Sequence, residues 1–192
     1  RAPELLAAQF LGYALWFLAL YLLLKLKYDR PFWRSLGWQP ASRGPLFYFA
    51  AGPALAFSVG LLGMLMQTPD LDTPLKALLS DRTSIVLIGI FAATLGPLCE
   101  ELAFRGFFLP LLIRSTGVIP GILLSALPFG LLHGPEYAWC WRHILLVTLA
   151  GAVFGWVRWR TASTSAATLV HAGYNMTFFA GFLAQGKQLP GV

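Results

Sequence analysis

Six apolar segments, each close to the length that crosses a lipid bilayer, recur along this 192-residue chain. A membrane-spanning α-helix needs about 20 consecutive, mostly apolar residues. The segments run from Glu4 to Leu24, Pro45 to Met66, Ser84 to Ile113, Val118 to His133, His143 to Trp159 and Thr164 to Ala184. The sequence therefore predicts an all-α, polytopic membrane helix bundle with about six spanning helices.

The composition supports a membrane protein. Hydrophobic residues make up 57% of the chain and charged residues 11%, whereas roughly a quarter of the residues in a soluble domain are charged. The net charge of +6 does not indicate nucleic acid, because the basic residues are scattered among apolar segments. We expect a multi-pass protein of the cell membrane, with the bilayer as its partner. The two cysteines show no metal-like spacing and indicate no disulfide framework.

Two polar connections are expected to form short helices at the membrane surface. One lies around Phe32 to Trp38, and the other lies in Thr68 to Arg82, where leucines recur at helical spacing. The connection after the first segment is rich in Lys and Arg, so the positive-inside rule places it in the cytoplasm. Residues 1–83 are expected to supply N-terminal membrane helices and interfacial segments, and residues 84–185 a helical core, within one continuous membrane domain.

Two acidic residues lie deep inside the third apolar segment. Glu100 and Glu101 stand there next to each other, although a charge at the bilayer centre costs about 2.5–3.5 kcal/mol on insertion scales. Glu101 and Arg105 are four residues apart, which predicts an ion pair on one helix face. Glu100 is offset from Glu101 by about 100° around the helix. The spacing therefore leaves Glu100 free for chemistry.

Two later apolar segments carry further pairs of residues at the same spacing, Phe129 with His133 and His171 with Asn175. Hydrolysis of an amide needs an activated water and a group that stabilises the oxyanion. Glu100 is suited to act as the base. His133 is suited to hold the water, to transfer its proton or to bind a metal, and His171 and Asn175 to donate to the oxyanion. Two histidines and a glutamate also form a zinc ligand set, although the chain has no HExxH motif.

The motifs resemble those of the CPBP (CAAX protease and bacteriocin-processing, or Abi) intramembrane endopeptidases. That family shows EExxxR, FxxxH and HxxxN motifs in this order. Here they correspond to residues 100–105 (EELAFR), 129–133 (FGLLH) and 171–175 (HAGYN). The resemblance covers about Ser84 to Phe179, and no motif position departs from the pattern.

The resemblance implies an endopeptidase that hydrolyses a peptide bond in a membrane-associated or lipidated, CAAX-like peptide or protein. Glu100 would activate the water beside His133, supported by Glu101 and Arg105, and His171 with Asn175 would form the oxyanion or ligand pair. Both a zinc mechanism, with Glu100, His133 and His171 as ligands, and a metal-free glutamate mechanism are argued for this family. Phe129 is expected to shape the substrate pocket by packing.

Other interpretations of the same residues stay open. In one of them Glu101 and Arg105 form a purely structural pair, because ions inside a membrane pair whether or not they catalyse. In a second interpretation the whole chain is a non-catalytic peptide-binding or immunity scaffold of the same fold. A proton or ion carrier is a third, although the sequence shows no repeated halves of the kind that transporters often have.

Overall fold

The computed structural model describes residues 2–79 and 81–184. Within these ranges the regular secondary structure consists of helices without a strand, which confirms the all-α membrane bundle. The boundary expected at residue 185 lies outside the described residues. The longer helices are α1 (Ala2–Leu22), α3 (Pro45–Leu65), α5 (Arg82–Ala93), α8 (Val118–Leu132), α9 (Trp141–Thr161) and α10 (Thr164–Ala184). The shorter pieces are η1 (Leu23–Lys27), α2 (Phe32–Ser35), α4 (Pro74–Leu78), α6 (Leu95–Glu101), η2 (Leu102–Phe108), α7 (Leu109–Thr116) and η3 (Gly134–Tyr137).

Four helical stretches of the described chain are long and apolar enough to cross a membrane. They are residues 3–27, 45–65, 82–116 and 141–161, and α8 is a shorter apolar helix. The sequence predicted six spans, and the sixth forms α10, with 21 residues. The buried face of this helix includes the polar residues Thr164, Thr168 and His171. Short helices also form where interfacial ones were expected, as α2 and α4.

The third apolar segment is not one regular α-helix. It is interrupted at Thr94, whose φ of −132° and ψ of −82° lie outside the helical region, between α5 and α6. Pro97 explains the position of the break, because a proline has no backbone N–H and its ring crowds the carbonyl four residues earlier. After α6 the chain continues as the π-helical piece η2, and such wider turns occur frequently at functional sites.

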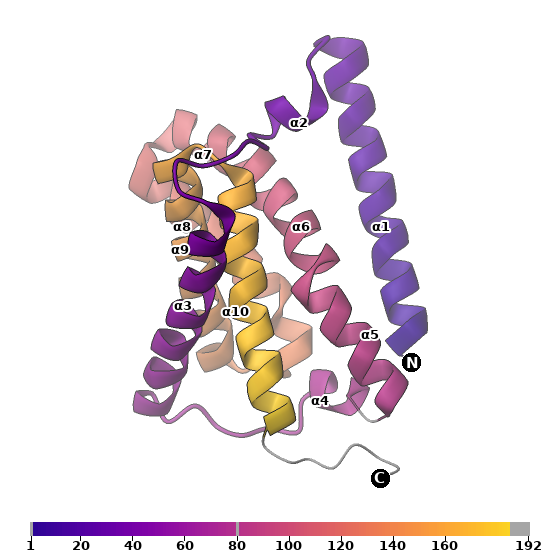
Figure 1. The fold of residues 1–192 in the computed structure, drawn as a ribbon, viewed down its shortest axis with the longest axis vertical. Helices are drawn as coiled ribbons and strands as arrows, with labels where there is room; N and C mark the ends of the chain where they lie inside the picture. Colours follow the sequence, from indigo (N-terminus) through magenta and orange to yellow (C-terminus); the bar gives the residue numbers. More distant parts are fainter. Residues whose placement is uncertain (1, 80, 185–192) are drawn as a thin grey trace.

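Helix α10 lies inside the bundle, where it packs along α3, α9, α5 and α6; Figure 1 shows it between α3 and α6. The approach of α3 is possible because two glycines lie at the crossing. A Cβ atom on Gly52 would overlap the backbone of Tyr174, and one on Gly173 would overlap the carbonyl oxygen of Phe49. Small residues at such crossings allow membrane helices to pack closely. The N-terminus of α10 is tied to the connection after α2, since the Thr164 amide donates to the Gly37 carbonyl at 2.9 Å.

Two clusters of buried apolar side chains hold the helices together. The larger one joins α3, α8, α9 and α10 and includes Phe129, Phe154 and Val170. The smaller one consists of Leu20, Leu36 and Leu102 and attaches α1 to η2. Large apolar side chains on the outer surface, such as Phe57 and Ile119, are more than 70% exposed, as expected of residues that face lipid.

Candidate active site

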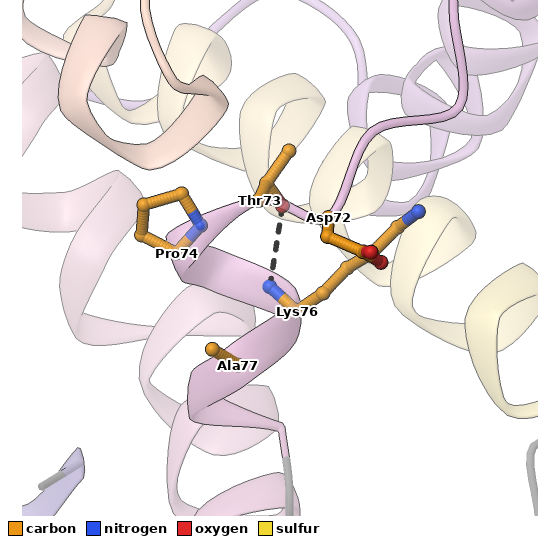
Figure 2. Close-up of a pocket in the computed structure, with 5 residues that line it drawn as sticks. All are labelled: Asp72, Thr73, Pro74, Lys76 and Ala77. Atoms are coloured by element: carbon orange, nitrogen blue, oxygen red, sulfur yellow. Dashed lines mark hydrogen bonds between the residues drawn. The ribbon is translucent and has the colours of Figure 1, made fainter.

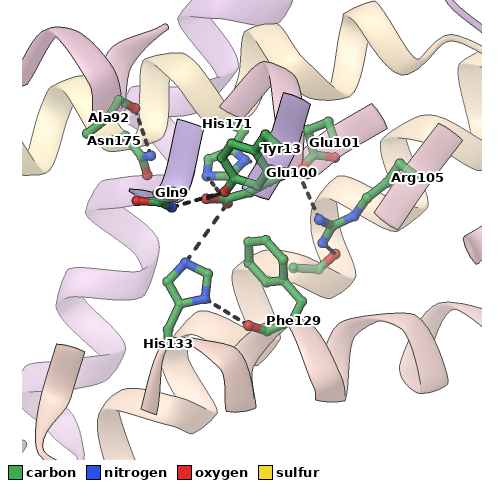
Figure 3. A network of polar contacts seen from close by, with 11 residues as sticks. Gln9, Tyr13, Ala92, Glu100, Glu101, Arg105, Phe129, His133, His171 and Asn175 are labelled. Atoms are coloured by element: carbon green, nitrogen blue, oxygen red, sulfur yellow. Dashed lines mark hydrogen bonds and ion pairs between the residues drawn. The ribbon is translucent and has the colours of Figure 1, made fainter. Parts of the chain in front are cut away.

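The predicted site residues come from three parts of the bundle and meet between them (Figure 3). Glu100 and Glu101 end α6, and Arg105 lies in η2. Phe129 is in the last turn of α8, His133 follows that helix directly, and His171 and Asn175 lie one turn apart in α10. The break at Thr94 and the wider turns of η2 lie on either side of the two glutamates, so the least regular part of the third segment carries the charges.

Glu101 and Arg105 form the ion pair that their spacing predicts. The Nη1 atom of Arg105 lies 2.9 Å from Oε1 of Glu101, and both side chains are fully buried. The Nη2 atom donates to the carbonyl oxygen of Gly151 in α9 at 2.7 Å. Gly151 has no side chain to block this contact, since a Cβ there would lie 3.0 Å from Nη2. The pair therefore ties η2 to α9.

His171 connects the two glutamates. Its Nδ1 lies 2.9 Å from Oε1 of Glu101, and its Nε2 lies 3.8 Å from Oε2 of Glu100. An ionised carboxylate oxygen only accepts hydrogen bonds, so in the neutral imidazole Nδ1 carries the hydrogen. The lone pair of Nε2 therefore faces Glu100. The ring is stacked on Phe154, with centroids 4.5 Å apart, which holds it in this orientation.

His133 has the same arrangement of its two ring nitrogens. Its Nδ1 lies 2.8 Å from the carbonyl oxygen of Phe129, which is again only an acceptor. This carbonyl is available because the backbone amide of His133 bonds to Gly130, one residue short of the α-helical partner. The Nε2 atom lies 3.9 Å from Oε2 of Glu100. Thus, in the neutral form, each imidazole directs its unprotonated nitrogen to the same carboxylate oxygen.

Glu100 is the exposed member of the two glutamates, with 18% of its side chain accessible. Its separations from the imidazole nitrogens are longer than a direct hydrogen bond. Polar atoms at such distances are commonly bridged by water. A water molecule at this position would have acceptors for both of its hydrogens. The spacing therefore leaves room for a water molecule between the carboxylate and the two imidazoles.

A zinc ion fits the chemistry of these donors but not their spacing. Hydrogen-bonded Nδ1 atoms with free Nε2 lone pairs are typical of zinc-binding histidines. Tetrahedral zinc places its nitrogen and oxygen ligands about 3.4 Å from one another, whereas the separations here are 3.8 and 3.9 Å. In the described part of the chain no group of three or more His, Cys, Asp and Glu side chains is suited to hold a metal.

Phe129 packs against the arginine of the buried ion pair and against both imidazoles. Its ring is 2% exposed, and the guanidinium carbon of Arg105 lies 4.3 Å from the ring centroid. The ring also contacts His133 and His171, at centroid distances of 4.8 and 5.8 Å. One aromatic side chain thus supports the arginine and both histidines.

Asn175 contacts a neighbouring helix instead of the carboxylates. Its amide nitrogen donates to the carbonyl oxygen of Ala92 in α5 at 2.9 Å, as Figure 3 shows. This carbonyl lies two residues before the break at Thr94. The contact holds α10 against α5 at the end of that helix.

Tyr13 and Gln9, which the sequence analysis did not select, also reach the site (Figure 3). The hydroxyl of Tyr13 lies 3.5 Å from Oε1 of Glu100, and Gln9 donates to that hydroxyl at 3.1 Å. They are four residues apart in an apolar segment, the spacing that predicts a shared helix face. This spacing of two polar residues is the feature of the sequence that could have indicated Gln9 and Tyr13 as site residues.

A pocket lies away from this site, at the start of α4 (Figure 2). It is lined by Asp72, Thr73, Pro74, Lys76 and Ala77. The hydroxyl oxygen of Thr73 accepts a hydrogen bond from the backbone amide of Lys76 at 3.3 Å, which begins the helix. None of the predicted site residues lines this pocket.

Comparison with known proteins gives one match. A family model described as Rce1-like, type II CAAX prenyl endopeptidase, matches residues 82–177. The matched region begins with α5 and includes the three motifs, but α1 lies outside it. No curated protein and no solved structure matches the chain.

Proposed function

Since the chain belongs to the Rce1-like family of type II CAAX prenyl endopeptidases, we propose that it cleaves a peptide bond in a lipidated, CAAX-like peptide. Such a substrate is held in the bilayer by its lipid. The exposed apolar side chains of the bundle are suited to contact with that lipid. We further propose that the protein is a multi-pass protein of the cell membrane, with the Lys- and Arg-rich connection after the first helix in the cytoplasm.

The observation that supports this function best is the convergence of three lone-pair acceptors. Oε2 of Glu100 faces Nε2 of both His133 and His171 at 3.8–3.9 Å. A water between them donates one hydrogen to the carboxylate and the other to an imidazole. Its own lone pairs then point away from these groups, toward a substrate carbonyl.

In the proposed reaction Glu100 accepts a proton from the water as the water oxygen attacks the carbonyl carbon. The C–O bond forms, and the carbonyl electrons move to the oxygen. Collapse of this tetrahedral intermediate breaks the C–N bond, and Glu100 returns its proton to the leaving amine. Water is consumed, and the products are an acid and an amine. The acid's remaining proton leaves through His133, whose side chain is 20% exposed.

The oxyanion of the intermediate needs a hydrogen-bond donor. An asparagine amide nitrogen carries two hydrogens, and only one of those on Asn175 is directed to Ala92. We assign the second hydrogen to the oxyanion. In this proposal Glu100, His133 and Asn175 carry every step, and none is assigned to a metal.

The function is tested with the purified protein in detergent and a farnesylated peptide that ends in a CAAX sequence. Mass spectrometry of the products identifies the bond that is cleaved. We expect release of a C-terminal fragment, faster than from the same peptide without the lipid. An Asp29→Asn variant, altered at an exposed carboxylate in the connection after η1, is the control and should cleave normally. If the protein binds the peptide without cleaving it, the function is that of a non-catalytic scaffold.

A further inference from the structure

Helix α1 meets the rest of the bundle through one narrow face. Among residues 3–22 the four most buried are Leu6, Tyr13, Phe17 and Leu20. These positions lie seven, four and three residues apart, which places them on one stripe of the helix. Tyr13 is the only polar member of the stripe. The one hydroxyl on this face therefore meets the one carboxylate that the proposed function uses as a base.

The surroundings of Tyr13 fix both its ring and its hydroxyl. The ring lies nearly parallel to that of Phe91 in α5, with centroids 6.5 Å apart and an interplanar angle of 9°. Gln9 donates to the hydroxyl oxygen at 3.1 Å. Because the oxygen accepts this bond, its own hydrogen is directed to another acceptor. Oε1 of Glu100 is that acceptor, at 3.5 Å.

The two oxygens of Glu100 thus have separate partners. Oε1 faces Tyr13, whereas Oε2 faces the two imidazoles. A glutamate carboxylate turns readily about its last side-chain bond. A donor on one oxygen restricts this rotation and keeps the other oxygen directed at the water.

We propose that Tyr13 is a positioning residue for Glu100, so that the catalytic unit includes α1 as well as the matched residues 82–177. This inference rests on the proposed function, in which Glu100 is the base. Tyr13 acts through Glu100 and does not contact the substrate. Its loss should therefore lower kcat and leave KM unchanged.

The test compares Tyr13→Phe with Tyr21→Phe in the full chain. Tyr21 is on the same helix, is 48% exposed and contacts Phe32 through its ring, so its variant loses a hydroxyl away from the site. The net free energy of a hydrogen bond to a charged group is about 1.5 kcal/mol at the lower end of its usual range. The lower value applies because the Tyr13–Glu100 contact is long, at 3.5 Å, and it corresponds to about a tenfold change in rate.

We expect Tyr13→Phe to lower kcat about tenfold on the farnesylated peptide with KM within about twofold of the unmodified protein. Tyr21→Phe should match the unmodified protein in both constants. Gln9→Leu should lower kcat by a smaller factor, because the hydroxyl loses only its orienting donor. Thermal unfolding in detergent should be the same for the two tyrosine variants and the unmodified protein, since both rings are retained.

Two results would overturn the inference and leave the proposed function intact. One is equal kcat for Tyr13→Phe and Tyr21→Phe while Glu100→Gln is inactive. The other is a raised KM with unchanged kcat for Tyr13→Phe, which would make Tyr13 a substrate contact. An unmodified protein that cleaves no peptide would refute the proposed function and this inference together.

Discussion

The Nδ1 atom of His171 lies 2.9 Å from Oε1 of Glu101, and this contact determines which nitrogen of the ring faces Glu100. The same carboxylate oxygen also accepts the hydrogen bond from Arg105. The buried ion pair of Glu101 and Arg105 therefore does more than neutralise two charges. It also holds the imidazole that, in the proposed reaction, orients the water.

The two histidines should differ when each is replaced by alanine. His171→Ala removes a hydrogen bond to the fully buried Glu101, so the free energy of unfolding should fall by about 1.5–3 kcal/mol together with kcat. His133→Ala removes a side chain that is 20% exposed, and kcat should fall strongly with little change in stability. Steady-state kinetics and unfolding in detergent measure both effects. Equal destabilisation by the two substitutions would contradict this division.

Arg105→Met should destabilise the protein strongly. It leaves Glu101 charged in a site without solvent access, and breaking a buried ion pair costs about 3–5 kcal/mol. The double variant Glu101→Leu with Arg105→Met should recover part of the stability, because no unpaired charge remains. Its kcat should stay low, since His171 has lost its acceptor. A double variant that regains both stability and full activity would show that the pair is purely structural.

Gly151→Ala should destabilise the protein more than Gly155→Ala, its matched control one turn along α9. A Cβ at position 151 would lie 2.8 Å from a ring carbon of Phe129 and 3.0 Å from Nη2 of Arg105. At position 155 the nearest atom would be 3.4 Å away. Overpacking of this kind typically costs about 1–3 kcal/mol. Unfolding in detergent tests the order, and equal stability of the two variants would contradict the packing described here.

Treatment with a chelator should leave the cleavage of the farnesylated peptide unchanged. The expectation follows from the 3.8–3.9 Å separations between Glu100 and the imidazole nitrogens, which are wide for zinc ligands. Elemental analysis of the treated, active protein completes the measurement. Loss of activity on chelation with recovery on addition of zinc would show that the zinc alternative is correct.

Much of the fold follows from simple patterns in the sequence. Apolar segments of bilayer length predict the helices, and Glu101 and Arg105 form the pair that their spacing predicts. Helix periodicity alone also places Glu100 and Glu101 on different faces. In the structure Arg105 pairs with Glu101 alone, whereas His171 contacts both glutamates. The short leucine-bearing connection before Arg82 forms a helix as well.

Other features depend on contacts between segments that are distant in the sequence. Asn175 meets Ala92, which is 83 residues away, and Tyr13 meets Glu100 across 87 residues. Hydrophobic periodicity does not specify which helices become neighbours, so neither contact was predicted. The break at Thr94 is different. Pro97 was visible in the sequence, but a single apolar segment was expected to form a single helix.

The central claim is that Glu100 activates the water, and the most direct test is the kcat of purified Glu100→Gln with the farnesylated peptide. The glutamine keeps the size of the side chain but cannot accept the proton. Loss of a general base typically costs about 10²–10⁴-fold in rate. We predict a fall in kcat of this size with unchanged thermal unfolding. A folded Glu100→Gln protein that cleaves at the normal rate would contradict the mechanism.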